Sequence, residues 1–181
     1  AGPLVTLCWL PFPVHPWVFH VFTDKKTCYE QFSGYTFSQR FGLPKPLASF
    51  LARIVSGYVS TLMASAGAIP VYRGSLHIGA TFKETVADLQ AGDSVLIFPD
   101  VDYTDDSDNI GAVYDGFLLI NRFWRRVSDK PLNFVPLRLD HHTRRITAGA
   151  PVQFDPDRDQ KEEMVRVRET LRAEINAQDQ A

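Results

Sequence analysis

Arg73 and Gly74 are the first residues whose types and spacing suit a chemical task. They follow an apolar run, residues 68–72, and Ser75 comes next. An arginine guanidinium can donate two parallel hydrogen bonds to two phosphate oxygens, and a glycine lets a ligand approach the backbone closely. The segment is therefore a candidate phosphate site, with an ordinary surface arginine as the alternative.

Asp100 is the acid of a second candidate site. It follows Pro99 and a short apolar run, residues 95–98. Because Pro99 has no amide hydrogen to give to a sheet, the strand is expected to end there, with the acid just beyond its carboxyl end. Ligands of open α/β sheets bind in the crevice outside the carboxyl ends of the strands. We therefore expect Asp100 to contact a ligand.

Both candidates belong to one predicted strand-helix-strand unit. Residues 68–73 and 94–98 are predicted strands, and residues 76–90 carry apolar side chains at helical spacing. This order of elements is typical of parallel strands joined by a crossover helix. Arg73 and Asp100 would then lie at the same edge of the sheet.

The acidic segment after the second strand allows a metal-binding interpretation. Asp100 and Asp102 resemble the paired acids with which nucleotide-sugar glycosyltransferases hold a divalent cation, and hard cations prefer clustered carboxylates. Asp105, Asp106 and Asp108 do not fit a calcium loop, because no glycine stands at its sixth position. The pattern favours the alternative, a solvated acidic loop.

The histidines offer a general-base hypothesis. Asp24 follows His20 by four residues, and His15 is close in the sequence. A carboxylate that orients an imidazole can support general-base chemistry. His77, at the start of a predicted helix, could add positive charge to the phosphate site when it is protonated. The pattern alone identifies none of these residues as catalytic.

The remaining elements complete an α/β pattern. We predict strands at residues 17–22 and 132–139, a hairpin or edge strand at residues 145–154 and a last helix from about residue 160. The expected fold class is α/β, with a mixed, largely parallel sheet flanked by helices. The length of 181 residues favours a single domain over residues 1–181.

A long apolar helix is predicted at residues 49–66. Its apolar residues recur in adjacent pairs every four positions, at Phe50/Leu51, Ile54/Val55, Tyr58/Val59 and Leu62/Met63. Such a stripe could be the wall of an acyl pocket, a face for membrane contact or the inner face of an ordinary core helix. The pattern favours the core helix.

Composition argues against several classes of protein. The 19 Lys and Arg against 21 Asp and Glu give a net charge of −2 without a basic block, so no nucleic-acid partner is expected. Cys8 and Cys28 show no metal-ligand spacing, which favours reduced thiols in a cytosolic protein. Residues 1–22 are very apolar, but Pro11, Pro13 and Pro16 break the apolar run, so it does not predict a membrane span.

Four blocks of the chain, taken in order, resemble a known family. They are Ile69-Pro-Val-Tyr-Arg73, Leu96-Ile-Phe-Pro-Asp100, Tyr114-Asp-Gly116-Phe and Phe134-Val-Pro136-Leu. The set resembles the glycerolipid acyltransferases, the 1-acylglycerol-3-phosphate acyltransferase family. The resemblance implies a glycerol-3-phosphate acyltransferase-like fold and the transfer of a fatty acyl group to the hydroxyl of a lysophospholipid or glycerol phosphate. The donor would be acyl-CoA or acyl carrier protein, with no metal and no other cofactor.

The resemblance also implies roles for single residues. Arg73 would hold the phosphate of the acceptor. Asp100 stands where the family has glutamate, and Val101 where it has glycine, which shortens the reach of the acid and stiffens the turn. The substrate-binding residues implied in this way are Arg73, Gly74, Phe98, Pro99, Asp100 and Pro136.

The catalytic base of that family is not found in the sequence. In the family, the histidine of a His-x-x-x-x-Asp motif deprotonates the acceptor hydroxyl. No such motif occurs in the 181 residues, since His20 and Asp24 are one residue too close. We therefore identify no catalytic residue and expect the catalytic block either to precede Ala1 or to be missing from the protein.

The implied lipid substrate and the apolar opening suggest association with a membrane surface. The expected location is the cytoplasm, peripheral at the inner face of the membrane. Two other functions remain open: a non-catalytic module that binds lipid phosphates, and a metal-dependent glycosyltransferase that uses Asp100 and Asp102.

Overall fold

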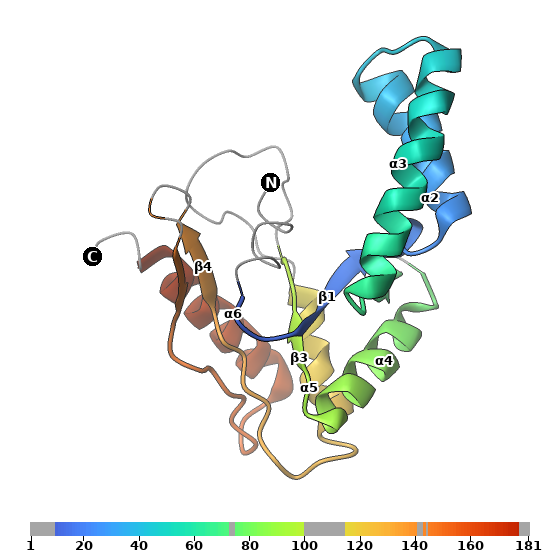
Figure 1. Ribbon diagram of the computed structural model, residues 1–181. Coiled ribbons are helices and arrows are strands. Elements are labelled where there is room, and N and C mark those ends of the chain that lie inside the picture. The colour runs from blue at the N-terminus through green and yellow to red at the C-terminus, as the bar shows by residue number, and fades with distance from the viewer. Residues whose placement is uncertain (1–9, 73–74, 100–114, 141–142, 144, 178–181) are drawn as a thin grey trace. The chain divides into compact units, whose positions relative to one another are not determined.

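The computed structural model describes residues 10–72, 75–99, 115–140, 143 and 145–177 (Figure 1). The chain divides into two compact units. We call residues 13–96 the sheet unit, and residues 97–181 with 1–12 the hairpin unit. The chain combines helices with a parallel sheet, so the predicted α/β class is confirmed. The single-domain organisation stays a prediction.

Three parallel strands form the sheet of the sheet unit. β1 (Val14–Phe19) is central, with β2 (Ile69–Val71) on one side and β3 (Ser94–Leu96) on the other. Phe19 pairs with Val71, so β1 and β2 end at the same level. Pro16 pairs with Leu96, so β3 lies beside the first half of β1.

Prolines occupy positions of this sheet where a missing amide hydrogen is tolerated. β1 begins three residues earlier than predicted and contains Pro16, and β2 pairs with it only from Trp17 on. Pro70 lies in β2, whose outer side carries no described strand. An edge strand accepts proline at positions that face away from its neighbour, and Pro16 has a ladder partner only on its β3 side.

α4 (Ile78–Ala91) connects β2 to β3 and forms the core with the sheet. Phe82 of this helix is buried, and its ring lies 5.9 Å from that of Trp17 in β1. The indole Nε1 of Trp17 donates a hydrogen bond to Thr85 Oγ1 at 2.9 Å. The predicted strand-helix-strand unit is therefore present, and β1 lies between its two strands.

Helices fill the chain between β1 and β2. They are η1 (His20–Phe22), α2 (Lys25–Gln31), the π-helix η2 (Phe32–Arg40) and α3 (Lys45–Ser65). α3 packs against α2 and η2, and Figure 1 shows α2 and α3 side by side. Cys28 of α2 is fully buried.

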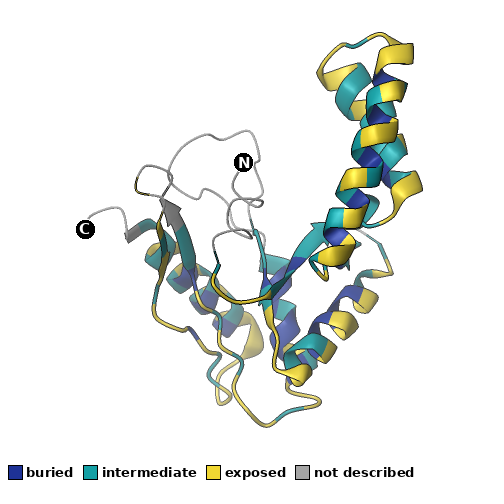
Figure 2. Ribbon diagram, in the orientation of Figure 1, coloured by how far each residue is buried: buried dark blue, intermediate teal, exposed yellow. Residues whose placement is uncertain are grey.

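The prediction of an ordinary core helix for α3 is wrong. Phe50, Ile54 and Tyr58 of the predicted stripe are 62%, 58% and 71% exposed. Four small side chains and Met63 of the predicted stripe line the buried face, and Figure 2 shows the buried and exposed positions along the helix. The buried residues of α3 are Ala48, Ala52, Ser56, Ser60 and Met63.

The hairpin unit combines short helices, one hairpin and a long last helix. It contains η3 (Asp115–Leu119), α5 (Ile120–Trp124), the antiparallel strands β4 (Leu137–Asp140) and β5 (Arg145–Ala148), and α6 (Gln160–Ala177). Its buried apolar side chains come from η3, α5 and α6, with Val152 next to the hairpin. These are Phe117, Leu118, Ile120, Trp124, Val152, Val167 and Leu171.

Candidate functional site

The carboxyl ends of β1 and β2 carry the first group of candidate functional side chains. His20 directly follows β1, and its Nδ1 lies 3.3 Å from the carbonyl oxygen of Val71, the last residue of β2. Because a carbonyl oxygen only accepts hydrogen bonds, Nδ1 carries the proton in this contact. When the ring is neutral, Nε2 carries the lone pair and can accept a hydrogen bond.

Aromatic rings hold His20 in place. It stacks on Tyr72 with 4.9 Å between ring centroids, and Phe19 meets it edge-on at 4.7 Å. The ring of His77 lies 6.0 Å from that of Tyr72. We call His20, Tyr72 and His77 the edge cluster. In the sequence, Tyr72 directly precedes the predicted phosphate-binding residue Arg73.

Asp24 does not orient His20 as a catalytic acid-histidine pair would require. Its Oδ1 accepts hydrogen bonds from the backbone N–H groups of Lys26 and Thr27, both at 3.0 Å, and so caps α2. The bond from Thr27 is the main cause that lowers the pKa of Asp24 below its usual value. No hydrogen bond or ion pair joins Asp24 to His20 among the described residues.

Three of the six predicted substrate-binding residues lie outside the described residues. These are Arg73, Gly74 and Asp100. Asp102, the second acid of the glycosyltransferase hypothesis, also lies outside them. Within the described part of the chain, no group of three or more His, Cys, Asp or Glu side chains is arranged to hold a metal ion.

The other three predicted residues belong to the hairpin unit. Phe98 and Pro99 are half-buried and follow β3 without strand structure, so pairing ends at Leu96, slightly before the proline. Pro136 is buried, and its carbonyl oxygen accepts a hydrogen bond from the backbone N–H of Gly149 at 2.9 Å. That contact stabilises the β4–β5 hairpin.

A second histidine organises the opposite edge of the sheet. His15 Nδ1 lies 3.1 Å from the carbonyl oxygen of Gly67 and 3.2 Å from Asp88 Oδ2, and its Nε2 lies 3.8 Å from Asp93 Oδ2. Gly67 has a φ of +59°, and a Cβ there would come within 2.8 Å of His15 Nδ1. Burial, with Asp88 as a second cause, raises the pKa of the nearby Glu84. These contacts tie the start of β1 to α4 and to the chain before β2.

Sequence reasoning named His15 but missed its partners. Its contact residues lie between 52 and 78 positions further along the chain, and no local pattern marks them. Gly67 was the one partner with a local signal, because a glycine that follows a helix often ends it with a positive φ.

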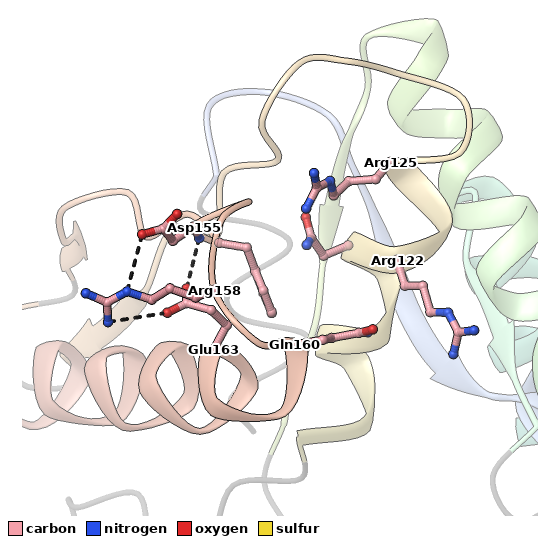
Figure 3. A pocket seen from close by; sticks show the side chains of 8 residues that line it. Arg122, Arg125, Asp155, Arg158, Gln160 and Glu163 are labelled. Atoms are coloured by element: carbon pink, nitrogen blue, oxygen red, sulfur yellow. Dashed lines mark hydrogen bonds and ion pairs between the residues drawn. The ribbon is translucent and has the colours of Figure 1, made fainter.

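The hairpin unit contains a pocket of about 170 Å³. Figure 3 shows Arg122 and Arg125 on one side of it, with Arg158 and Glu163 on the other. No residue of the predicted site lies here. The lining residues are Asn121, Arg122, Arg125, Phe154, Asp155, Arg158, Gln160 and Glu163.

Ion pairs within the hairpin unit compensate the two carboxylates of this pocket. Glu163 is 1% exposed and accepts two hydrogen bonds from Arg166, at 2.8 and 2.7 Å. It also accepts one from the backbone N–H of Asp155 at 2.9 Å. Arg158 lies 3.3 Å from Asp155 Oδ2 and 3.9 Å from Glu163 Oε1. The network joins the start of α6 to the segment before it, which is a structural task.

The fold is thus an α/β arrangement with a small parallel sheet. The edge cluster, His20, Tyr72 and His77, lies where β1 and β2 end. Comparisons with protein-family models, with curated proteins and with solved structures find no match for the chain.

Proposed function

We propose that this chain forms the acceptor-binding part of an acyltransferase with a glycerol-3-phosphate acyltransferase-like fold. The acyl group would pass from acyl-CoA or acyl carrier protein to the hydroxyl of a lysophospholipid or glycerol phosphate. The observation that carries the proposal is the parallel order β2-β1-β3. The carboxyl ends of parallel strands point toward one edge of the sheet, and the two predicted binding segments begin two residues after β2 and β3 end.

Arg73 is the proposed phosphate ligand. It comes two residues after the end of β2, next to Tyr72 of the edge cluster. A guanidinium suits a phosphate dianion because its planar fork donates two parallel hydrogen bonds. Gly74 and Asp100 complete the proposed acceptor site, with Asp100 accepting a hydrogen bond from a glycerol hydroxyl.

The proposed reaction requires a base for the acceptor hydroxyl. The hydroxyl oxygen bonds to the thioester carbonyl carbon, the carbon–sulfur bond breaks, and the hydroxyl proton leaves through the base to the released thiol. In the proposal this base belongs to the His-x-x-x-x-Asp block, which does not occur in these 181 residues. His20, fixed by Val71 and Tyr72, positions the end of β2 from which the phosphate-binding segment starts.

A second candidate function is a non-catalytic module that binds lipid phosphates. It needs only the phosphate site and no His-x-x-x-x-Asp block, and these 181 residues contain no such motif. Both candidates share the phosphate site and a location in the cytoplasm at the inner face of the membrane. They differ only in acyl transfer.

Titration calorimetry with glycerol 3-phosphate tests the shared phosphate site. The wild-type chain is expected to bind, and Arg73→Ala is expected to weaken binding by about tenfold or more, since a hydrogen bond to a charged group contributes about 1.5–3 kcal/mol. Arg73→Lys should fall between the two, because an ammonium keeps the charge and loses the fork. Arg172→Ala, an exposed arginine of α6, is the matched control and should bind like the wild type.

Two results would contradict the proposal. One is equal binding of glycerol and glycerol 3-phosphate, and the other is an Arg73→Ala variant that binds like the wild type. Release of free thiol from acyl-CoA by the full-length protein with lysophosphatidate then decides between the two candidates. Binding without thiol release favours the non-catalytic module.

A further inference from the structure

Large apolar side chains of α3 point away from the helices that it packs against. Leu47, Phe50, Ile54 and Tyr58 follow one another at spacings of three and four, so they form one stripe on the helix. All four are exposed. We call these four residues the α3 stripe. Six of the twelve large exposed apolar residues of the described chain lie between residues 35 and 58, in η2, in α3 and at Phe41 between them, which makes this the main exposed apolar surface of the sheet unit.

Small residues form the opposite face of α3. Ala48, Ala52, Ser56 and Ser60 are buried and recur every four residues where α3 packs against α2 and η2. The hydroxyls of Ser56 and Ser60 donate to backbone carbonyls of their own helix, at 3.3 Å each, so they need no other partner. Helices in lipid pack through small residues and turn large apolar residues outward, whereas helices of water-exposed folds do the reverse.

The charge of this region complements an anionic membrane. Residues 25–65 contain five Lys and Arg side chains against one acid, Glu30, although the whole chain has a net charge of −2. All five cations are exposed: Lys25, Lys26, Arg40, Lys45 and Arg53. An exposed apolar face on a segment with an excess of cations suits the boundary between headgroups and acyl chains of anionic bilayers.

Exposed aromatic residues of the same region also suit the boundary between headgroups and acyl chains. Tyr35 and Phe41 of the η2 region and Phe50 and Tyr58 of α3 are exposed. Tyrosine and other aromatic side chains are enriched where a protein meets the membrane–water interface, because one end is apolar and the other polar.

The geometry points to the α3 stripe as a docking surface for the interface of an anionic lipid bilayer. α3 is the one described helix long and apolar enough to cross a membrane, and 22% of that stretch is buried. Two features argue for docking on the surface: one face of α3 is covered by α2 and η2, and Arg53 is exposed midway along it. This surface is distinct from the phosphate site and does not depend on acyl transfer.

Vesicle sedimentation tests the surface. The full chain is mixed with phosphatidylcholine vesicles with and without phosphatidylglycerol, and lysophospholipid is left out, so the result is independent of the acceptor site. Binding is expected to the anionic vesicles and to weaken at about 0.5 M NaCl. Lys45→Gln should lower the partition coefficient about fivefold.

The double variant Phe50→Gln/Ile54→Gln should lower the partition coefficient by about tenfold or more, because two large apolar side chains are lost from the lipid contact. Both positions are exposed, so circular dichroism should show an unchanged fold. Val165→Gln, at a 51% exposed position of α6, is the matched control and should bind like the wild type.

Three results would overturn the inference. The double variant could bind vesicles like the wild type. The wild-type chain could fail to bind vesicles and form dimers that the double variant does not form. The α3 stripe would then be an interface between two copies of the chain. Alkaline carbonate could fail to release the membrane-bound chain, which would show that α3 spans the bilayer.

Discussion

Glu163 shows how one buried acid can be kept ionised. Two hydrogen bonds from Arg166 and one from the backbone of Asp155 surround its carboxylate. The bonds from Arg166 are the main cause that lowers the pKa of Glu163 from 4.5 to about 2. The charge is therefore stable in the folded chain although the side chain is 1% exposed.

Replacing Glu163 should cost stability in a pH-dependent way. Glu163→Gln is expected to lower the free energy of unfolding by about 3 kcal/mol near neutral pH, because Arg166 loses its charged partner. The folded chain takes up the proton of Glu163 only near pH 2, whereas the unfolded chain takes it up near its ordinary value of 4.5. The stabilisation is thus fully present above that ordinary pKa and is lost as the pH falls toward the folded one.

Urea unfolding at about pH 7 and about pH 3 measures this effect. The difference between wild type and Glu163→Gln should shrink at the lower pH. Glu169→Gln, an exposed acid of the same helix that pairs with Arg168, is the control and should change stability by less than about 0.5 kcal/mol. A pH-independent difference would contradict the role given to the ionised carboxylate.

Single residues were predictable only where the partner is close in sequence. The pair His20 and Asp24 was hypothesised from a spacing of four, but Asp24 caps the helix that it begins. An aspartate before a helix satisfies free backbone N–H groups, and this local bond takes precedence over a more distant imidazole. His15 and its partners come together only through the pairing of three strands, which no local pattern encodes.

The buried face of α3 gives an element-scale prediction. Ala52 is fully buried where α3 packs against α2 and η2. Ala52→Leu should therefore lower the free energy of unfolding by about 1–3 kcal/mol, since the extra atoms force the helices apart. Urea unfolding followed by circular dichroism measures the change.

Ala64→Leu is the control on the same helix. Ala64 is exposed, so the same substitution should change stability by less than about 0.5 kcal/mol. Equal effects of the two substitutions would show that α3 does not bury the face that contains Ala52.

The spacing of apolar residues predicted where the helices lie in the chain better than it predicted which face of a helix is buried. The predicted helix at residues 76–90 matches α4, and the last helix begins at Gln160 as expected. For α3, the same periodicity marked an apolar stripe, but the small residues between the large ones decided which face packs inward. The π-helix η2 could not be predicted, because no propensity rule separates a π-helix from a loosely patterned segment.

At the scale of the whole molecule, the sequence predicted how the strands and the helix between them are connected. A crossover helix between two apolar runs predicted parallel strands with one common edge, and β2 and β3 are parallel in one sheet. The central position of β1 was not predictable, since its prolines argued for a break in the chain. The residues that would complete the site, Arg73 and Asp100, lie outside the described residues, so their roles stay predictions.

Thermal unfolding of the whole chain separates the phosphate site from the metal hypothesis. Glycerol 3-phosphate at about ten times its Kd should stabilise the folded chain by about 1.4 kcal/mol. For a chain of this size, such a gain raises Tm by about 3–6 °C. Manganese chloride should leave Tm unchanged, because the proposed chemistry needs no metal. Arg73→Ala should remove the response to glycerol 3-phosphate and leave Tm without ligand unchanged.

The acidic segment supplies the control for this experiment. Asp102→Ala removes one of the two acids that a nucleotide-sugar glycosyltransferase would need, and it should not alter the response to glycerol 3-phosphate. A Tm that rises with manganese in the wild type but not in Asp102→Ala would favour the glycosyltransferase. In the acyltransferase proposal a cationic side chain, Arg73, binds an anionic ligand. In the glycosyltransferase hypothesis a pair of carboxylates, Asp100 and Asp102, binds a cation. The sign of the ligand that stabilises the chain therefore decides between them.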